Sequence, residues 1–411
     1  MLRIAMLSYH TCPLATLGGK DTGGMNVYVR DLTRELGRMG IHVDVFTRSQ
    51  DEHVPHVLHD LGYGNRVVHI LAGPEEPKAK TAVANYIPEF AEGIKNFAAE
   101  KNIQYDVIHS HYWTSGLAAE RLSDAWGGVP IVHMFHTLGE MKNRVARSED
   151  ERADEKRLNG ERRVLRRAER IIVATIAELT QLRFLYQADQ RKMIVVPPGV
   201  DTSHFYPIPA DEAKQFIGLP PEARMVLFVG RIEPLKGLDT LIHAMARLDM
   251  QAILRPVHLA VIGGEPNADS ENMSDEMARL QKLCDELSMG GMVVFLGKRG
   301  QDTLPYYYSA TEVVVMPSLY ESFGMVALEA MACGTPVIAS DVGGLGYLVQ
   351  NGVTGYTIPD SEPDTLRDKL SALLNDAPLR QTMGVSAAEH AKSYDWEIIA
   401  AQIIEAYKST L

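Results

Sequence analysis

Apolar runs of strand length alternate with helix-like segments along the chain, and few folds are compatible with such an alternation. A first series of apolar runs occupies residues 2–8, 42–48, 67–71, 105–111, 129–136, 170–175 and 192–199. A second series occupies residues 224–232, 257–264, 292–297, 312–318 and 336–340. Strands that alternate with helices form parallel sheets with helices on both faces. The sequence therefore predicts an α/β fold with two parallel sheets.

The two series meet in a proline-rich stretch. The chain has 411 residues, a length typical of two domains. Prolines cluster in "VVPPGVDTSHFYPIP" (195–209), and such junctions are typical of linkers between domains. We therefore expect the domain boundary in this stretch.

Composition and charge indicate which partners and which cellular location the protein is expected to have. The net charge is −12, which disfavours nucleic acid as the main partner because phosphate backbones attract basic surfaces. The three cysteines, Cys12, Cys284 and Cys333, are far apart and lack metal-ligand spacing, which favours a reducing, cytoplasmic location. The first residues are too short and polar for a signal peptide, and no apolar run approaches the about 20 residues needed to span a bilayer. Peripheral membrane contact through the basic run 162–170 and assembly as a homodimer are left open.

The stretch "ESFGMVALEAMACGTPVIAS" carries the strongest chemical signal. Glu321 and Glu329 flank a Phe-Gly turn that opens a predicted helix with Ser322 as its N-cap. The first amides of such a helix have no internal partner and form an anion site, and Gly324 permits close approach of a ligand to the backbone. Glu329 could accept hydrogen bonds from a sugar diol. In an incidental βαβ unit it would be a buried acid without a partner, which is costly.

Two further strand ends carry candidate ligand-binding residues. Arg231 and Lys236 follow the run 224–232, and ligands of open α/β sheets bind beyond the carboxyl ends of strands. Arginine grips phosphate oxygens bidentately and lysine acts as a point charge, although two exposed loop cations would show the same pattern. The glycine pairs 23–24 and 263–264 also precede helices or end strands. The first pair lacks the GxGxxG spacing of a dinucleotide site, and glycines in turns such as that of the second pair are common.

Together, "GGMN", "HSHYW", "VPPGVD", "VGRIEPLKG" and "ESFGMVALEAMACGTPVIAS" resemble the retaining glycosyltransferases of family GT4 over essentially the whole chain. Glu321 and Glu329 match the E-x7-E motif of that family. The resemblance implies a GT-B fold, which has two Rossmann-like domains with parallel sheets that face each other across the active-site cleft. It also implies a final helix that returns to the first domain. The implied domains are 1–197 plus 395–411 for the acceptor and 198–394 for the donor.

The resemblance further implies a nucleoside diphosphate sugar as donor, usually UDP-linked, and no cofactor or metal ion. No DxD-type metal motif is present, and fixed cations can replace a metal ion. The implied catalytic residues are His133, Arg231, Lys236 and Glu321. His133 of "VHMFHT" would contact the donor sugar, and Arg231 and Lys236 would hold the diphosphate. The other implied donor-binding residues are Gly23, Gly24, Gly263, Ser322, Phe323, Gly324, Met325, Val326 and Glu329, the last of these holding the ribose.

Within the family, "DTGGMNVYV", "AGPEEPK" and "HSHYW" resemble segments of the inositol-phosphate N-acetylglucosaminyltransferases of the mycothiol pathway. This similarity implies an acceptor site made of Asn26, Lys78, Tyr112, Thr137 and Arg157. Two cations and two hydroxyl groups suit a phosphate group. Sucrose-phosphate synthases, which use fructose 6-phosphate, share much of the pattern. The expected reaction therefore transfers a sugar from a UDP-sugar to a phosphorylated polyol or sugar such as inositol phosphate. The transferred sugar would be GlcNAc or glucose.

Several alternatives stay open on the sequence alone. Within enzymes they are a sucrose-phosphate synthase and a lipid-directed mannosyltransferase, the latter because of the basic run. A non-catalytic nucleotide-sugar-binding protein is disfavoured by the intact set of cations and acids. His109 and His111 alternate on a predicted strand, but two histidines without a third ligand are weak evidence for a metal site. The charged segment 142–168 is interpreted as a solvated helix, within which Arg157 and Glu161 could pair one turn apart.

Overall fold

The computed structural model describes residues 2–16, 22–78, 80–146, 148–249, 253, 256–265 and 273–411. The chain divides into two compact units. Unit 1 comprises Met1–Ala15, Gly24–Gly199 and Trp396–Leu411, and unit 2 comprises Thr16–Gly23 and Val200–Asp395.

Unit 1 is built on a sheet with the strand order β3-β4-β2-β1-β5-β6-β7-β8. The strand pairs are parallel except for β3 with β4. Its strands are β1 (Arg3–Leu7), β2 (His42–Arg48), β3 (Val57–Leu58), β4 (Arg66–Ile70), β5 (Val107–His111), β6 (Ile131–Met134), β7 (Arg170–Val173) and β8 (Met193–Val195). Its helices are α1 (Gly24–Arg38), α2 (Lys80–Val83), α3 (Ile87–Glu100), α4 (Trp113–Ala125), α5 (Gly139–Val145), α6 (Glu155–Arg167), α7 (Ile176–Tyr186) and α16 (Trp396–Lys408), with short 3-10 turns η1 (Ala84–Tyr86), η2 (Glu149–Glu151) and η3 (Gln190–Lys192).

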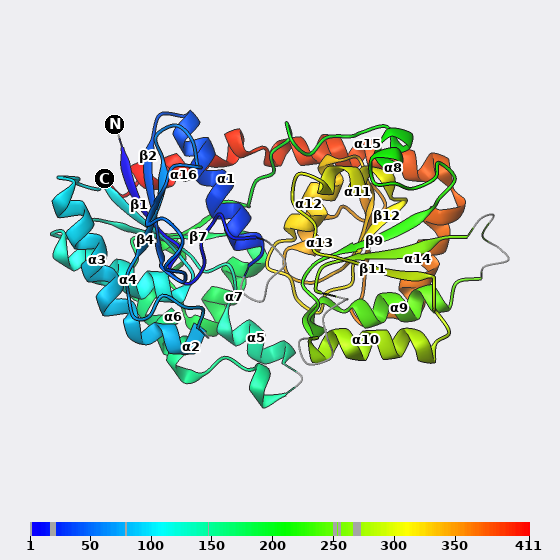
Figure 1. The fold of residues 1–411 in the computed structure, drawn as a ribbon, viewed down its shortest axis with the longest axis horizontal. Coiled ribbons are helices and arrows are strands. Elements are labelled where there is room, and N and C mark those ends of the chain that lie inside the picture. Colours follow the sequence, from blue (N-terminus) through cyan, green and yellow to red (C-terminus); the bar gives the residue numbers. More distant parts are fainter. Residues whose placement is uncertain are drawn as a thin grey trace. The chain divides into compact units, whose positions relative to one another are not determined.

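Helices cover both faces of this sheet (Figure 1). On one face, α1 and α16 pack beside each other, and their Tyr28 and Tyr407 contact His111 and His109 of β5. On the other face, α3, α4 and α6 cover Ile108 and the neighbouring buried residues. Successive side chains of a strand point to opposite faces, so β5 contributes to both layers.

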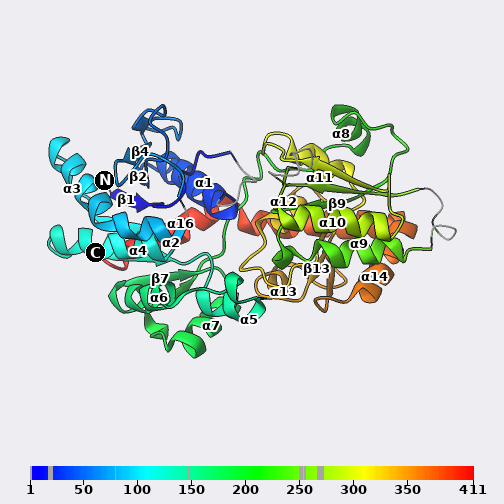
Figure 2. The same ribbon diagram turned by 60° about the horizontal axis from the view of Figure 1, so that its bottom comes forward.

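Unit 2 is built on a wholly parallel sheet with the order β11-β10-β9-β12-β13-β14. Its strands are β9 (Met225–Val229), β10 (His258–Ile262), β11 (Val293–Gly297), β12 (Val313–Met316), β13 (Val337–Ser340) and β14 (Gly355–Ile358). Helices α9 and α10 lie on one side of this sheet, and α11 and α12 on the other (Figures 1 and 2). The helices are α8 (Ala210–Phe216), α9 (Leu238–Ala246), α10 (Asp275–Glu286), α11 (Leu304–Ala310), α12 (Met325–Ala332), α13 (Leu345–Leu348), α14 (Pro363–Asn375) and α15 (Ala377–Ala391), with turns η4 (Pro234–Lys236) and η5 (Lys392–Tyr394).

Each sheet has a point where its strand order reverses direction. In unit 1 this point lies between β1 and β5, and in unit 2 it lies between β9 and β12. Ligands of open α/β sheets bind at such points, outside the carboxyl ends of the strands. The loops after β1, β5, β9 and β12 are therefore the segments most favoured to form binding sites.

The predicted alternation of strands and helices and the two parallel sheets are confirmed. Two strands escaped the sequence analysis: β3 has only two residues, and β14 begins at Gly355, a weak strand former. The interpretation of 142–168 as a solvated helix was wrong. The segment includes the end of α5 and all of α6, and Glu161 in α6 is fully buried.

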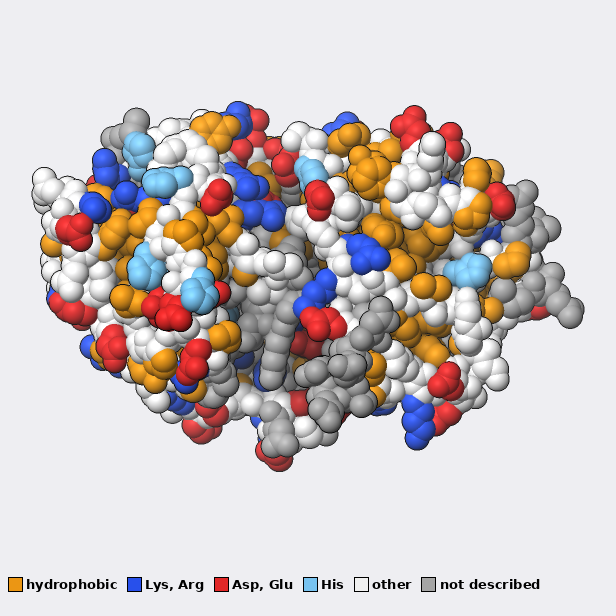
Figure 3. All heavy atoms as spheres, in the orientation of Figure 1, with side chains coloured by type: hydrophobic (Ala, Val, Ile, Leu, Met, Phe, Trp, Pro, Cys, Tyr) orange, Lys and Arg blue, Asp and Glu red, His pale blue; other side chains and the backbone are white. Residues whose placement is uncertain are grey.

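The surface carries a mixture of charges. On the face in Figure 3, acidic and basic side chains are interspersed with hydrophobic ones among the residues that are coloured. Within the described residues, no helix has both the length and the apolar character that a membrane crossing requires.

Candidate functional site

An ion pair lies at the switch point of unit 2. Nζ of Lys236, in the turn after β9, is 2.5 Å from Oε2 of Glu321, in the loop after β12. Both side chains are 17% exposed. The pair therefore joins two of the predicted catalytic residues at the carboxyl edge of the sheet, and a ligand there would meet a partly desolvated cation.

The two loops that carry this pair are fixed to each other by the backbone. The amide of Leu319 donates to the carbonyl of Leu235 at 2.9 Å. Gly237 has φ 64°, and a Cβ at this position would lie 2.0 Å from the carbonyl oxygen of Pro317. Only glycine permits this close approach, so the sequence "KG" places Lys236 against the second loop.

The helix after Glu321 begins at Met325, with Gly324 as its N-cap at φ 108°. The prediction that Ser322 caps this helix was wrong, because the chain turns through the left-handed region at Gly324. Within the described chain, the amides of Phe323, Gly324 and Met325 donate to no other group. The N-terminus of α12 thus presents unpaired donors beside the Lys236–Glu321 pair, as an anion site requires. Phe323 is buried, and Met325 and Val326 are half-buried.

A second glycine turn, which the sequence analysis missed, holds this loop in place. A Cβ at Gly343 would lie 1.9 Å from the carbonyl oxygen of Glu321, and one at Gly344 would lie 2.4 Å from Cα of Phe323. The amide of Gly344 also donates to the Glu321 carbonyl at 2.9 Å. The doublet in "DVGGLG" was the available signal for this contact.

Glu329 is buried on α12, where two side chains bind it. Nε2 of Gln301 donates to one carboxylate oxygen at 3.0 Å, and the Tyr308 hydroxyl donates to the other at 2.8 Å. The expectation that Glu329 would lack a partner unless a ligand supplied one was therefore wrong. Both partners lie well before Glu329 in the sequence, so the local motif gave no signal of them.

The remaining donor candidates lie on three segments. Nη1 of Arg231 pairs with Oε1 of Glu233 at 2.8 Å, and both side chains are 34% exposed. Gly263 has φ 136°, and a Cβ there would lie 1.9 Å from the carbonyl oxygen of Gly230. A Cβ at Gly23, which groups with unit 2, would lie 4.0 Å from Nε of Arg231, whereas Gly24 begins α1 in unit 1.

In unit 1, the structure brings together three of the five acceptor candidates. Nη2 of Arg157 donates to the main-chain oxygen of Thr137 at 3.0 Å and to its hydroxyl at 3.2 Å. The guanidinium carbon of Arg157 lies 5.1 Å from the ring centroid of Tyr112. Tyr112 follows β5, Thr137 follows β6, and Arg157 comes from the first turn of α6. This arrangement gathers a guanidinium, a hydroxyl group and a tyrosine ring beside the carboxyl ends of two strands.

Arg157 is oriented by a buried carboxylate. Oε1 of Glu161 accepts from Nε of Arg157 at 2.8 Å, which confirms the predicted pairing one turn apart. Glu161 is 0% exposed. It also accepts from the amide of Gly139 at 3.0 Å and from the hydroxyl of Tyr186. Because Glu161 is fully satisfied, it can hold the guanidinium in one position.

Asn26 and Lys78 lie on other segments. Nδ2 of Asn26, on α1, donates to Oγ1 of Thr11 and to the carbonyl of Cys12, both at 2.7 Å. Nζ of Lys78, in the loop after β4, lies 2.5 Å from Oε1 of Glu76. Asn26 thus fixes the loop after β1, and the cation of Lys78 is neutralised by its own loop.

The two histidines of "VHMFHT" differ in position. His133 lies within β6 and is 0% exposed; its Nδ1 contacts the Ser110 hydroxyl at 2.8 Å, on the α4 side of the sheet. His136 follows the strand with φ 62° and is half-buried. Its Nε2 lies 2.9 Å from Nδ1 of His111. Burial lowers the pKa of His136 to about 3, so this imidazole is neutral at physiological pH.

His109 and His111 point to the α1 and α16 side of the sheet. Nδ1 of His109 contacts the Tyr407 hydroxyl at 2.7 Å, and the His109 and His111 ring centroids are 4.2 Å apart. Burial, with a smaller effect of His136, lowers the pKa of His109 to about 3. In the part of the chain that the structure describes, no group of three or more His, Cys, Asp or Glu residues is arranged to hold a metal ion.

The pKa of Glu178, at the start of α7, should make the stability of unit 1 depend on pH. Burial raises its pKa from 4.5 to about 7. The folded state therefore holds a proton that the unfolded chain loses between these pH values, and stability falls as the pH rises through this window. We expect the free energy of unfolding of Glu178→Gln, relative to wild type, to rise by about 3 kcal/mol from pH 4 to pH 8.

Urea unfolding followed by tryptophan fluorescence measures this difference, because Trp113, Trp126 and Trp396 all lie in unit 1. Glu149→Gln, in an exposed turn, serves as the control and should follow the wild-type pH profile. Parallel profiles for Glu178→Gln and wild type would show that Glu178 titrates normally.

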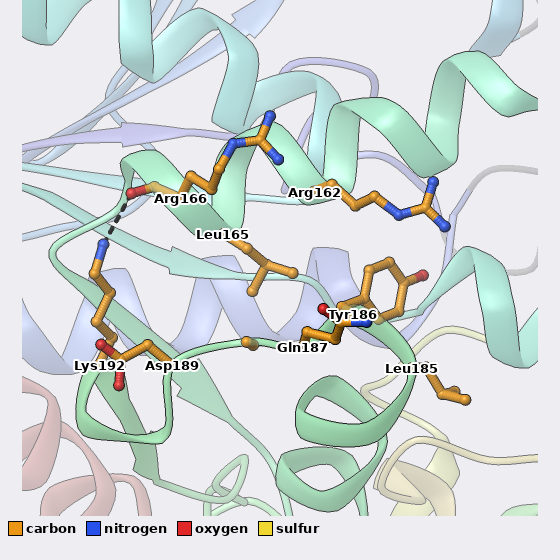
Figure 4. A pocket seen from close by; sticks show the side chains of 9 residues that line it. Arg162, Leu165, Arg166, Leu185, Tyr186, Gln187, Asp189 and Lys192 are labelled. Atoms are coloured by element: carbon orange, nitrogen blue, oxygen red, sulfur yellow. Dashed lines mark hydrogen bonds between the residues drawn. The ribbon is translucent and has the colours of Figure 1, made fainter.

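A hollow of about 590 Å³ lies between α6, α7 and η3. Three cations line it, but two already have partners. Nζ of Lys192 donates to the carbonyls of Arg166 (Figure 4) and Ala168, both at 2.8 Å, and Arg162 pairs with Glu140 at 2.8 Å. Lys192 thereby caps the carboxyl end of α6, and we assign no ligand to this hollow.

Comparisons with known proteins agree with this fold. Residues 22–204 match the family model described as Glycosyltransferase Family 4, and residues 209–390 match that described as Glycosyl transferases group 1. A D-inositol 3-phosphate glycosyltransferase of Kribbella flavida is 40% identical over 410 residues, which cover 99% of this chain and 95% of that relative.

Two solved structures are also similar. A sucrose-phosphate synthase of Thermosynechococcus elongatus is 35% identical with a TM-score of 0.90, and the match covers 100% of this chain and 99% of that one. Anabaena HepE in complex with UDP and glucose has a TM-score of 0.76 at 21% identity, with 100% of both chains covered, and shares the fold. The predicted resemblance and the GT-B fold class are confirmed. This chain belongs to the family 4 glycosyltransferases.

Proposed function

We propose that the protein transfers a sugar, with retention of its anomeric configuration, from a UDP-sugar to a phosphorylated polyol such as inositol phosphate. The observation that carries this proposal is the Lys236–Glu321 pair beside the unpaired amides of α12. Cleavage of the donor places extra negative charge on the departing diphosphate. Donors that are fixed in advance stabilise such charge, and Lys236, Arg231 and the α12 amides supply them without a metal ion.

In the proposed reaction, the bond between the anomeric carbon and the diphosphate oxygen breaks while the acceptor oxygen bonds to the same face of the sugar. The proton of the acceptor hydroxyl passes to the departing phosphate oxygen. Glu321 holds Lys236 in place before the donor arrives, and Glu329 accepts hydrogen bonds from the ribose hydroxyls. Glu329 already accepts from Gln301 and Tyr308, which fixes its orientation for this role.

For the contact with the donor sugar, we propose His136 in place of His133. His133 is fully buried within its strand, with Phe135 packed against its ring at 4.3 Å. His136 lies beyond the carboxyl end of β6 and is half-buried. Ligands bind at this edge of a parallel sheet, so His136 is better placed than His133 to meet one.

The acceptor phosphate is assigned to the group formed by Arg157, Thr137 and Tyr112. Arg157 presents a guanidinium that matches phosphate geometry, and Glu161 holds it in place. The relative named as a D-inositol 3-phosphate glycosyltransferase supports an inositol phosphate acceptor. UDP as the donor nucleotide is supported by the structure of HepE, which was solved in complex with UDP and glucose.

A second candidate is sucrose-phosphate synthesis, which is favoured by the TM-score of 0.90 to a protein of that name. The two activities differ in the acceptor and share the donor site. Purified protein should be offered UDP-GlcNAc or UDP-glucose with inositol phosphate, fructose 6-phosphate or a lipid acceptor, and nucleotide release should be measured. We expect release with inositol phosphate and an α-linked product by NMR. Release with fructose 6-phosphate alone would favour the second candidate, and a β-linked product would contradict retention.

A further inference from the structure

The contact between His111 and His136 determines which nitrogen of His136 carries its proton. Nδ1 of His111 and Nε2 of His136 are 2.9 Å apart, so one nitrogen donates and the other accepts. Burial lowers the pKa of both imidazoles, and each ring therefore carries one proton at neutral pH. Two arrangements remain, and they differ in the proton position of both rings.

The surroundings of His111 distinguish the two arrangements. Its Nε2 is buried and has no hydrogen-bond partner among the described residues. If His136 donated, His111 would carry its proton on Nε2 as a buried N–H without an acceptor. If His111 donates from Nδ1, Nε2 keeps only a lone pair. In this second arrangement the N–H without a partner among the described residues is Nδ1 of the half-buried His136 and not the buried Nε2 of His111. Buried N–H groups without partners are rare, which favours His111 as the donor.

Aromatic rings pack around His111 and His136. The Tyr28 ring meets the rings of His111 and His136 edge to face, at centroid distances of 5.5 and 5.2 Å. The His109 ring lies 4.2 Å from that of His111 on the strand side. His136 itself adopts φ 62°, an unfavourable conformation for a residue other than glycine, which its surroundings must maintain.

We propose that His111 is a positioning residue that donates from Nδ1 to His136 and keeps the His136 proton on Nδ1, where it can donate to a bound ligand. The catalytic part of this inference rests on the proposed contact between His136 and the donor sugar. The tautomer itself does not depend on any activity. Nδ1 of His136 makes no hydrogen bond within the described residues, so a hydroxyl group of the donor sugar can accept from it.

The tautomer is measured in full-length protein labelled with ¹⁵N-histidine, using two-bond ¹H–¹⁵N NMR correlations assigned with His136 variants. We expect His136 protonated on Nδ1 in wild type. His111→Asn retains an N–H donor close to the Nδ1 position and should preserve this tautomer. His111→Phe keeps the ring volume but removes the donor, and the His136 proton should then shift toward Nε2. Protonation on Nε2 in wild type, or no change in His111→Phe, would overturn the inference.

Kinetics separate this inference from the function on which it rests. We expect His111→Phe to lower kcat by about 100-fold through misplacement of His136, with the KM for the donor little changed, and His111→Asn to retain most of the activity. Equal losses in both variants would indicate a packing role and contradict the inference. A shifted tautomer with an unchanged kcat would instead overturn the proposed role of His136. Thermal unfolding of each variant confirms that it is folded.

Discussion

Replacing Lys236 with alanine is expected to lower kcat/KM by about 100- to 1,000-fold, which corresponds to about 2.7–4 kcal/mol of transition-state stabilisation. Lys236 is a cation at the switch point of unit 2, and its ammonium lies 2.5 Å from Glu321. The departing diphosphate would lose a fixed positive charge in the variant. The backbone contacts between Leu235 and Leu319 and between Gly237 and Pro317 do not involve the side chain, so the fold should remain intact.

Nucleotide release under saturating acceptor measures this effect, and circular dichroism reports the fold. Lys282→Ala is a matched control, because Lys282 also pairs with a glutamate in unit 2 but is 78% exposed on α10. This control should keep wild-type activity. Activity in Lys236→Ala close to that of the control would exclude Lys236 from the site.

Glu161→Ala is expected to lower the free energy of unfolding by about 3–5 kcal/mol. The substitution leaves Arg157 buried without its carboxylate and removes the acceptor of Gly139 and Tyr186. Because Arg157 also loses its fixed position, the KM for a phosphorylated acceptor should rise, while donor hydrolysis without acceptor should persist.

Urea unfolding followed by tryptophan fluorescence reports on unit 1, where the three tryptophans lie. Glu92→Ala serves as the control, because the Glu92–Lys95 pair is on the surface of α3 with Glu92 58% exposed. Such pairs contribute less than about 1 kcal/mol. If both variants lost the same small amount of stability, the Glu161 network would not support unit 1 as described.

The sequence was most informative where the fold and the site depend on residues that are close together in the sequence. The alternation of strands and helices predicted both sheets, and the position of Lys236 after a strand marked it as a candidate site residue. The pairing of Arg157 with Glu161 followed from helical spacing. Each of these inferences uses only local periodicity and the rule that parallel strands end at one edge.

The rest depended on contacts between distant segments. The cap of α12 is set by the turn at Gly343 and Gly344, which packs against the Phe-Gly loop. Glu329 accepts hydrogen bonds from Gln301 and Tyr308, which both lie outside its sequence motif. The choice between His133 and His136 depends on where β6 ends, and strand ends are the least certain part of a sequence prediction.

The central claim is that the diphosphate of the donor binds where the loops after β9 and β12 meet. A crystal structure of the protein with bound UDP tests it most directly. The account predicts phosphate oxygens within hydrogen-bond distance of Arg231, Lys236 and the amides at Phe323–Met325. A diphosphate bound at any other place on the protein, with Lys236 still paired only with Glu321, would contradict it.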